Sequence, residues 1–450
     1  MAQLSTLGAR RLGFGTYAAD NIPTNISEAK SHFLKQLHGE TAFEAPELMT
    51  SQEAMQMFIS RARVIKSGGT KEDVSNFPTQ AEVESADLNN RLKRIIVTKS
   101  PFLERLSLYW LSHFTSSDVS SSFSYFSSSI ETEAIRPNML GAFSNLLTSV
   151  STHPQMLFYL NNRSSIGPGS QRAARAPAPK RFGINENHAR EILELHSMGI
   201  DGGYHQQDII ELAKAMTGWS IDTRRQDIPI EARMTFNSKI HEPGTRAVLG
   251  KAYPDTGANQ AISIFRDLAH HPATARHVSR RMIKHFIGNP IPQPLEDEMT
   301  AAFIASEGDL MKVTSTLIEH QTTWTAPLTK LRTPLEFMAA TGRLLGWIPS
   351  PPKALNALAA MGQPYMMPGG PNGWPEENDT WAAPDTWKSR LDWAAQMSAH
   401  APVADLDPTQ LIHNAFGNDV SPETRAAVIG GATSNQSLTL MLLSPEFQRR

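Results

Sequence analysis

Apolar residues recur at the spacing of an α-helix through most of the chain, and this periodicity constrains the fold more than any other feature. In the stretch 208–216, Ile209, Leu212, Ala213 and Met216 are spaced at i, i+3, i+4 and i+7, which places them on one helix face. Alternating runs rich in Val, Ile and Thr, which are typical of strands, are scarce. The sequence therefore predicts an all-α fold, a large multi-helix globular protein with long ordered irregular loops. Further stretches with helical spacing are 45–65, 86–98, 101–114, 139–160, 258–268, 273–287, 296–320 and 333–345.

The length of the chain predicts more than one lobe, because a single compact core rarely serves 450 residues. We expect an N-terminal helical lobe (1–182) that ends in a basic flexible loop, a central helical lobe (183–348), and a Pro/Gly/Trp-rich loop with C-terminal helices (349–450). The 19% of charged residues and the formal net charge of -2 are those of a folded protein. They give no charge excess that would indicate a nucleic-acid partner.

The chain contains no cysteine. This excludes disulfides, thiolate nucleophiles, cysteine-held iron–sulfur clusters and cysteine-ligated zinc, so any metal would need His, Asp or Glu ligands. The first residues lack the apolar core of a signal peptide, and no run approaches the roughly 18 apolar residues of a membrane span. We therefore expect a cytoplasmic protein without a membrane span.

Three segments lack helical periodicity. Residues 115–129 are rich in serine but contain aromatic residues such as Phe123, which predicts an ordered loop held by aromatic side chains. Residues 163–181 combine Gly, Pro, Ala and basic residues, which favours a mobile surface loop. Residues 349–387 alternate Pro and Gly with tryptophans, among them Trp374, which predicts a long irregular connection held by aromatic burial.

The richest set of polar side chains follows the basic loop, in the stretch 185–199. Asn185 suits an N-cap and Gly199 suits the glycine that ends a helix, so about four turns of helix are expected between them. A polar stripe of this density on a helix that packs into an apolar core is costly unless it has a use.

On this helix Asn187, Glu191 and Glu194 lie in one stripe, and Arg190 is spaced to reach Glu194. One interpretation is a catalytic site in which Glu191 and Glu194 converge with His113 from another element, with Arg190 beside them. The three residues would bind a divalent metal or act as an acid–base group.

The alternative interpretation is structural, with Arg190, Glu191 and Glu194 in an ion-pair network that ties helices together. His196 faces the apolar side of the same helix and is expected to be a hydrogen-bonded core histidine. His113 lies on a mixed helix face, where a lone histidine is usually structural. The chain has none of the motifs of zincins, P-loops, dinucleotide-binding folds or α/β-hydrolases.

Ordered motifs spread over nearly the whole chain make it resemble a bacterial family catalogued as domain of unknown function 1800. Because the motifs keep their order over this length, the resemblance is specific. The motifs are Arg11-Leu-Gly-Phe-Gly15, Trp110-Leu-Ser-His-Phe114, Arg136-Pro-Asn-Met-Leu-Gly141, His153-Pro-Gln-Met-Leu157, the stretch from Asn185 to His196, Thr217-Gly-Trp219, His241-Glu-Pro-Gly244, His271-Pro-Ala-Thr-Ala275, Arg332-Thr-Pro-Leu-Glu-Phe337, Gly362-Gln-Pro364, Gly373-Trp-Pro375 and Ser444-Pro-Glu-Phe447.

The resemblance implies a helical fold and no particular activity. It also implies a partner, a protein of the family domain of unknown function 1501 that is often encoded beside it and commonly has a twin-arginine signal, so an alternative to the cytoplasm is export as a complex with that partner. The sequence departs from the family at Leu111, where many relatives have a second histidine, and in extra length in the basic loop. The first departure weakens a two-histidine metal site.

Two hypotheses follow for the function. The first is a metal- or carboxylate-dependent enzyme whose site lies where the polar face of the 185–199 helix meets His113 and the Trp374 loop. It predicts a concave pocket that contains Glu191 and Glu194. The second is a non-catalytic helical partner or scaffold protein in which the charged helix is an internal clamp, and it predicts arginine–carboxylate pairs with no open cavity.

Overall fold

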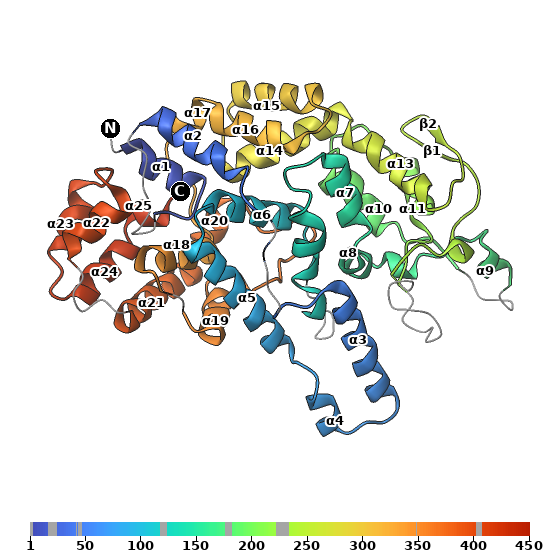
Figure 1. The fold of residues 1–450 in the computed structure, drawn as a ribbon, viewed down its shortest axis with the longest axis horizontal. Helices are drawn as coiled ribbons and strands as arrows, with labels where there is room; N and C mark the ends of the chain where they lie inside the picture. Colours follow the sequence, from blue (N-terminus) through green and yellow to red (C-terminus); the bar gives the residue numbers. More distant parts are fainter. Residues whose placement is uncertain are drawn as a thin grey trace.

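The chain folds into a mostly helical body, seen in a computed structural model (Figure 1). The structure describes residues 3–16, 25–41, 43, 47–117, 124–175, 182–221, 234–347, 349–401 and 407–450. Among these residues the strands form a single two-stranded sheet, so the predicted helical class is confirmed. No helix in the described ranges is long and apolar enough to cross a membrane.

The first half of the chain contains α1 (Gln3–Arg11), α2 (Ile26–Gln36), α3 (Ser51–Lys66), α4 (Lys71–Ser75), α5 (Gln80–Val97), α6 (Pro101–His113), the short turns η1 (Ser124–Phe126), η2 (Glu131–Ile135) and η3 (Asn162–Ser164), α7 (Phe143–Ser151), α8 (Pro154–Tyr159), α9 (Gln171–Ala174), α10 (Asn187–Glu191), η4 (Ile192–His196) and α11 (Gln206–Met216).

The second half contains η5 (Ser238–Ile240), β1 (Arg246–Val248), β2 (Lys251–Tyr253), α13 (Ala258–Ala269), α14 (Pro272–Phe286), α15 (Gln293–Ala305), α16 (Leu310–Glu319), α17 (Thr322–Thr325), α18 (Pro334–Leu345), α19 (Pro351–Ala360), α20 (Asn378–Trp381), α21 (Pro384–His400), α22 (Pro408–Phe416), α23 (Pro422–Ile429), α24 (Ser434–Leu442) and α25 (Pro445–Gln448).

Local sequence sets where many of these helices begin. At α18, the Thr333 side chain accepts a hydrogen bond from the Glu336 backbone N–H, and the Glu336 carboxylate accepts one from the Thr333 backbone N–H. This capping box satisfies two of the backbone donors that a helix start leaves unpaired, and Pro334 at the first helical position needs none. Such a start fixes α18 firmly, which matters because Glu336 lies beside the candidate site.

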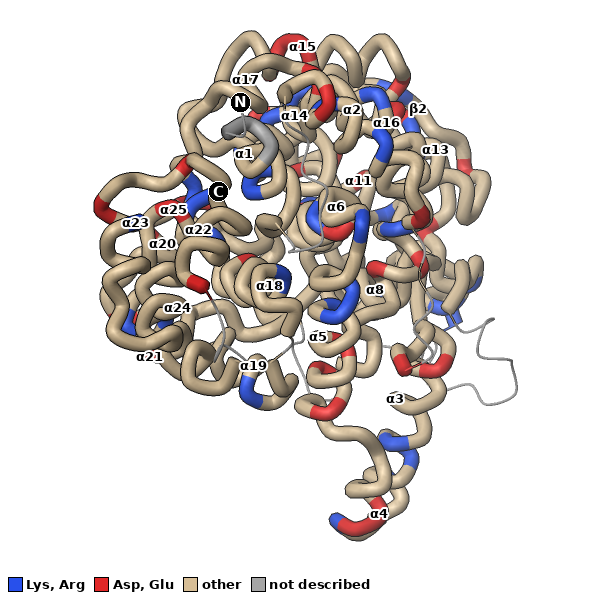
Figure 2. The backbone as a smooth tube through the Cα atoms, turned by 60° about the vertical axis from the view of Figure 1, so that its left-hand side comes forward, with Lys and Arg blue, Asp and Glu red and all other residues tan. Residues whose placement is uncertain are grey.

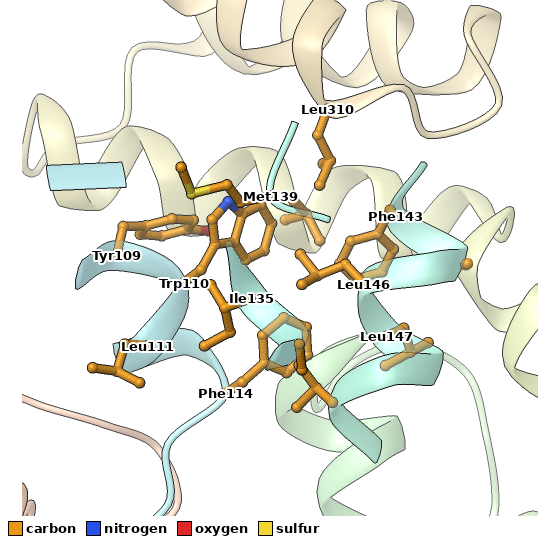
Figure 3. Packing of buried hydrophobic residues seen from close by; sticks show 14 of the residues in the cluster. Tyr109, Trp110, Leu111, Phe114, Ile135, Met139, Phe143, Leu146, Leu147 and Leu310 are labelled. Atoms are coloured by element: carbon orange, nitrogen blue, oxygen red, sulfur yellow. The ribbon is translucent and has the colours of Figure 1, made fainter. Parts of the chain in front are cut away.

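Helix α6 lies in the middle of the molecule and packs one face into the main core (Figure 3). Trp110 and Phe114 stack against each other with ring centroids 5.8 Å apart, and both rings contact Phe143 of α7. Leu111 belongs to a second stripe of residues on another side of α6. The residues of this stripe follow the i, i+3, i+4, i+7 spacing of one helix face. That stripe faces the pocket described below.

The buried apolar residues fall into two clusters. The larger runs from Leu12 to Trp324, and the smaller joins Phe14 and the second half of α5 to the segment from Leu335 to Phe447. The packing thus groups α5 with the C-terminal helices, and the three-lobe division stays a prediction. Both chain ends lie on the same side of the body (Figure 1).

The helical periodicity did not predict the hairpin of β1 and β2, whose strands pair antiparallel with Arg246 opposite Tyr253. Its two turn residues, Leu249 at φ 51° and Gly250 at φ 74°, both have the positive φ of a type I′ turn. The usual Asn-Gly or Asp-Gly signal is missing, because leucine occupies the first turn position. This small hairpin is the one strand pairing in the described sheet and leaves the confirmed helical class unchanged.

Of the segments predicted to be irregular, 349–387 is corrected, because it contains α19, α20 and the start of α21. Tyr125 and Phe126 in the serine-rich segment are buried, as predicted, whereas Phe123 lies outside the described residues. The basic segment is described up to residue 175, and there the Gly167 N–H donates to the Ile240 carbonyl at 2.9 Å. This bond ties the described part of the basic segment to η5, and the mobility of the loop stays a prediction.

Candidate functional site

The 185–199 helix forms where it was predicted, but with a wider last turn. Asn185 accepts a hydrogen bond from the Asn187 backbone N–H at 2.9 Å, α10 follows, and the chain then widens into the π-helical turn η4. Gly199 ends the segment at φ 82°. The π turn was not predictable from periodicity, and such turns are frequent at functional sites.

Arg190 on this helix pairs with two carboxylates of the same helical segment. Arg190 lies 3.2 Å from the Glu194 carboxylate and 3.5 Å from that of Glu186. Burial and the nearby Glu194 carboxylate raise the pKa of Glu191 above its ordinary value. These arginine–carboxylate pairs lie within one helical segment, and the contact of Arg190 with a second helix is its hydrogen bond to Gln206 of α11 at 2.9 Å, so the predicted network that ties helices together through Glu191 stays a prediction.

His113 and His196 are both fully buried, with ring centroids 6.4 Å apart. His113 Nε2 lies 3.1 Å from the His196 carbonyl oxygen, and His277 Nε2 lies 3.0 Å from the Leu195 carbonyl oxygen. Two histidines thus cap carbonyls that the end of η4 leaves free. The His196 ring is a core side chain as predicted, but neither of its nitrogens has a hydrogen-bond partner in the described structure.

Glu191, Glu194 and His113 are not assembled into a metal site. Among the residues that the structure describes, no group of three or more His, Asp or Glu side chains could hold a metal ion. Burial, with Arg281 nearby, holds the pKa of His113 well below its usual range, so this histidine is neutral. An acid–base role of Glu191 and Glu194 stays a prediction.

A pocket opens instead on the other side of α6, between this helix, the start of α18 and the Trp374 loop; we call it the α6–α18 pocket. Its free volume is about 80 Å³, by a measure in which one water molecule needs about 10–15 Å³. It therefore has room for several waters or a small ligand. Its lining includes Arg91, Leu108, Leu111, Ser112, Thr115, His285, Thr333, Leu335, Glu336, Leu358, Gln363, Tyr365, Met366, Trp374 and Glu376.

Gly373 lets the Trp374 loop approach α6 closely. Its φ is 83°, and a Cβ atom there would lie 2.2 Å from the carbonyl oxygen of Ser112. The next residue, Trp374, donates its backbone N–H to Ser112 Oγ at 3.3 Å. The Gly-Trp-Pro motif of this loop thus forms one wall of the pocket.

The polar end of the pocket holds a histidine–carboxylate pair. His285 Nδ1 lies 2.8 Å from Glu376 Oε1, and His285 Nε2 has no partner in the described structure. Burial lowers the pKa of His285 to about 4 although Glu376 opposes the shift, so the ring is neutral at pH 7. Its Nδ1 must then hold the proton that the Glu376 carboxylate accepts, which leaves a lone pair on Nε2.

Buried cations pair with both carboxylates that line the pocket. Lys330 Nζ donates to Glu376 Oε2, while Glu336 pairs with Arg105 at 2.7 Å and with Arg450 at 2.8 Å. Burial alone would raise the pKa of Glu376, but His285 and Lys330 hold it well below its ordinary value. Burial lowers the pKa of Lys330 to about 8.

Sequence reasoning named Trp374 and His113 but missed His285, Glu336 and Glu376. A partial signal was available, because four of the motifs that the chain shares with its family supply pocket residues, Glu336 among them, although none contains His285 or Glu376. The motifs are 110–114 on α6, 332–337 at the start of α18, and 362–364 and 373–375 in the loop. Their convergence is a property of the folded chain, so only the structure reveals it.

The family model described as "Protein of unknown function (DUF1800)" matches residues 8–449. No curated protein and no solved structure matches the chain. Since the matched segment covers nearly all 450 residues, the chain belongs to the DUF1800 family.

Proposed function

We propose that the protein is an enzyme that acts on a small molecule in the α6–α18 pocket, with His285 as general base. The observation that supports this most is the free Nε2 atom of a neutral histidine that lines the pocket, while its Nδ1 bonds to Glu376. A carboxylate behind an imidazole is the arrangement that catalytic bases use, because it fixes the tautomer and stabilises the imidazolium formed.

In this proposal the side chains have three roles: proton acceptor, positioning residue and exclusion of water. His285 accepts a proton from a hydroxyl, a water molecule or an acidic C–H of the ligand, and its positive charge is then stabilised by Glu376. Lys330 is a positioning residue, since it holds the second Glu376 oxygen. The leucines of α6 and the Trp374 side chain exclude water from the ligand.

For the 185–199 helix we propose a structural role. Its Arg190 bonds to carboxylates one turn away on both sides, and the histidines His113 and His277 hold its C-terminal carbonyls. None of the residues predicted as catalytic there lines the α6–α18 pocket. We therefore propose that the 185–199 helix is structural and that the reaction takes place in the α6–α18 pocket.

The test is turnover of a bacterial small-molecule extract, followed by untargeted mass spectrometry. We expect metabolites that wild type consumes and His285→Gln leaves untouched, while Glu376→Gln consumes them at least about tenfold more slowly. His270→Gln is the matched control, because His270 is exposed on the preceding helix end and should keep wild-type turnover. Equal consumption by folded His285→Gln would contradict the proposal.

Binding to a protein of the DUF1501 family, which the family resemblance implies, stays a prediction. Co-expression of the two chains followed by size-exclusion chromatography tests it. A complex that elutes as one species would also make export with the partner worth testing. Separate elution of both folded chains would contradict it.

A further inference from the structure

The charged side chains that line the α6–α18 pocket are all paired. They are Arg91, Glu336 and Glu376. Arg91 lies 2.7 Å from the Glu131 carboxylate, while Glu336 pairs with two arginines and Glu376 pairs with Lys330. Basic and acidic residues accordingly lie next to each other around α6 (Figure 2). The described lining therefore offers no unpaired charge, and it suits an uncharged ligand that is recognised by hydrogen bonds and apolar contacts.

The hydroxyl groups in the described lining also take part in hydrogen bonds already. Thr115 Oγ1 donates to the Ser112 carbonyl at 2.8 Å, and the Tyr365 hydroxyl donates to the Asp87 carboxylate at 2.9 Å. The bonded hydroxyls are those of Ser112, Thr115, Ser116, Thr333 and Tyr365. These bonds hold the walls of the pocket together, so the best donor for a ligand is a lining group that has no bond of its own.

Gln363 has such a group, the NH2 of its side-chain amide. The Oε1 atom accepts the backbone N–H of Leu335 at 2.8 Å, at the second position of α18. The Nε2 atom has no hydrogen-bond partner in the described structure, and unlike the unpaired atoms of the core it keeps accessible surface. Because the residue lines the pocket and is only 6% exposed, its NH2 group can donate to a molecule in the pocket.

Two helix ends fix the orientation of this amide. Gly362 at φ 86° ends α19, and the Gln363 backbone N–H donates to the Leu358 carbonyl at 2.9 Å, which is the closing bond of a Schellman motif. The Leu335 N–H is one of the donors that the start of α18 leaves unpaired, so it binds the amide oxygen and leaves the NH2 group for a ligand. The donor is thus held in place before a ligand arrives, which reduces the entropy lost on binding.

From this arrangement we infer that Gln363 is the hydrogen-bond donor to the ligand and that the ligand is a small uncharged carbonyl compound. The carbonyl oxygen accepts from Nε2, because an NH2 group offers donors and no acceptor. The short carbon chain lies against Leu108, Leu111 and Trp374. The inference rests on the proposed function and names its substrate class, since a hydrogen-bonded carbonyl makes the C–H beside it more acidic, and an acidic C–H is one of the proton sources proposed for His285.

Proton–nitrogen NMR of glutamine-labelled protein, titrated with butanone, measures this contact directly. Butanone should shift the side-chain NH2 signals of Gln363, which are assigned by their loss in Gln363→Glu. The signals of Gln293, which is exposed on α15, should not move. Butyrate and butylamine should bind at least about tenfold more weakly than butanone, because their charge would lose its hydration without gaining a partner. Unmoved Gln363 signals, or equal or tighter binding of either charged probe, overturns the inference.

Two variants test the donor itself. Gln363→Glu keeps an oxygen for the Leu335 N–H but has no donor at pH 7, so butanone affinity should fall about three- to tenfold. Gln363→Met has neither group and should lose the same affinity, so it serves the test if Gln363→Glu fails to fold. Unchanged butanone affinity in either folded variant overturns the inference. Turnover by wild type against His285→Gln decides the proposed function separately, since these titrations measure binding alone.

Discussion

The Nδ1 atom of His285 on α14 lies 2.8 Å from Oε1 of Glu376 in the Trp374 loop, 91 residues further along the chain. This contact, with Lys330 on the other carboxylate oxygen, holds the loop to the body at the polar end of the pocket. This contact bears both on the stability of the protein and on the proposed catalysis by His285. The effect of Glu376→Gln on unfolding measures its share in stability.

Glu376→Gln should lower the free energy of unfolding by about 2–3 kcal/mol, because it leaves the buried Lys330 ammonium without its anion. The value lies below the usual range for a buried pair because the Glu376 side chain is 20% exposed. Urea unfolding measures it. The adjacent Glu377→Gln is the control: its partner Lys284 is 34% exposed, so the loss should stay below about 1 kcal/mol. Equal losses in both variants would show that the Lys330 pair contributes no more than a surface pair.

Gly373→Ala should destabilise the protein by more than about 2 kcal/mol, because φ is positive and the new Cβ meets the Ser112 carbonyl. Gly369→Ala in the same loop should stay within about 0.5 kcal/mol, since no heavy atom lies within 4 Å of its Cβ position. Thermal and urea unfolding of the two variants compare them. A wild-type stability of Gly373→Ala would mean that the loop approaches α6 less closely than described.

His188 should make the protein less stable in acid. Burial lowers its pKa to about 3, and neither ring nitrogen has a partner in the described structure. The unfolded chain, with a histidine pKa of about 6.5, binds a proton that the folded chain does not, so stability is lost as pH falls below about 6.5. His188→Leu should change stability by less than about 1 kcal/mol at pH 7, and its advantage over wild type should grow by about 2 kcal/mol at pH 5. Parallel pH profiles for the two proteins would contradict this.

Glu191, Glu194 and His113 should hold no metal between them, because the described residues contain no group that could do so. Elemental mass spectrometry on tag-free protein should give the same metal content for wild type and Glu191→Gln. A near-stoichiometric metal that disappears in a folded Glu191→Gln variant would restore the metal hypothesis for the 185–199 helix.

Helical periodicity predicted most of the fold, since a residue's face on a helix depends on spacing within one turn. It predicted the helix that starts after Asn185 and ends at Gly199. It did not predict the π turn η4 or the Leu249-Gly250 hairpin, because both depend on backbone conformations that the local residues do not favour strongly.

The candidate site was less predictable, because its residues come from segments far apart in the sequence. Trp374 was named for its aromatic loop, and it does line the pocket. The polar stripe of Glu191 and Glu194 gave a stronger local signal than His285 or Glu376, but a local stripe does not tell whether arginine already pairs with its carboxylates. Tertiary packing decides that, and only the folded structure shows that His285, a histidine with an unpartnered Nε2 atom, lines the pocket.

The central claim is that His285, which lines the pocket, is a neutral imidazole with its proton on Nδ1 and no hydrogen-bond partner on Nε2 in the described structure. Long-range proton–nitrogen NMR of histidine-labelled protein, with the His285 signals assigned by their loss in His285→Gln, reads the tautomer directly. The account predicts the Nδ1–H tautomer from pH 6 to pH 8, a range well above the His285 pKa of about 4, and a tautomer shift toward the mixed state in Glu376→Gln. A proton on Nε2, or an imidazolium at pH 7 without ligand, would contradict it.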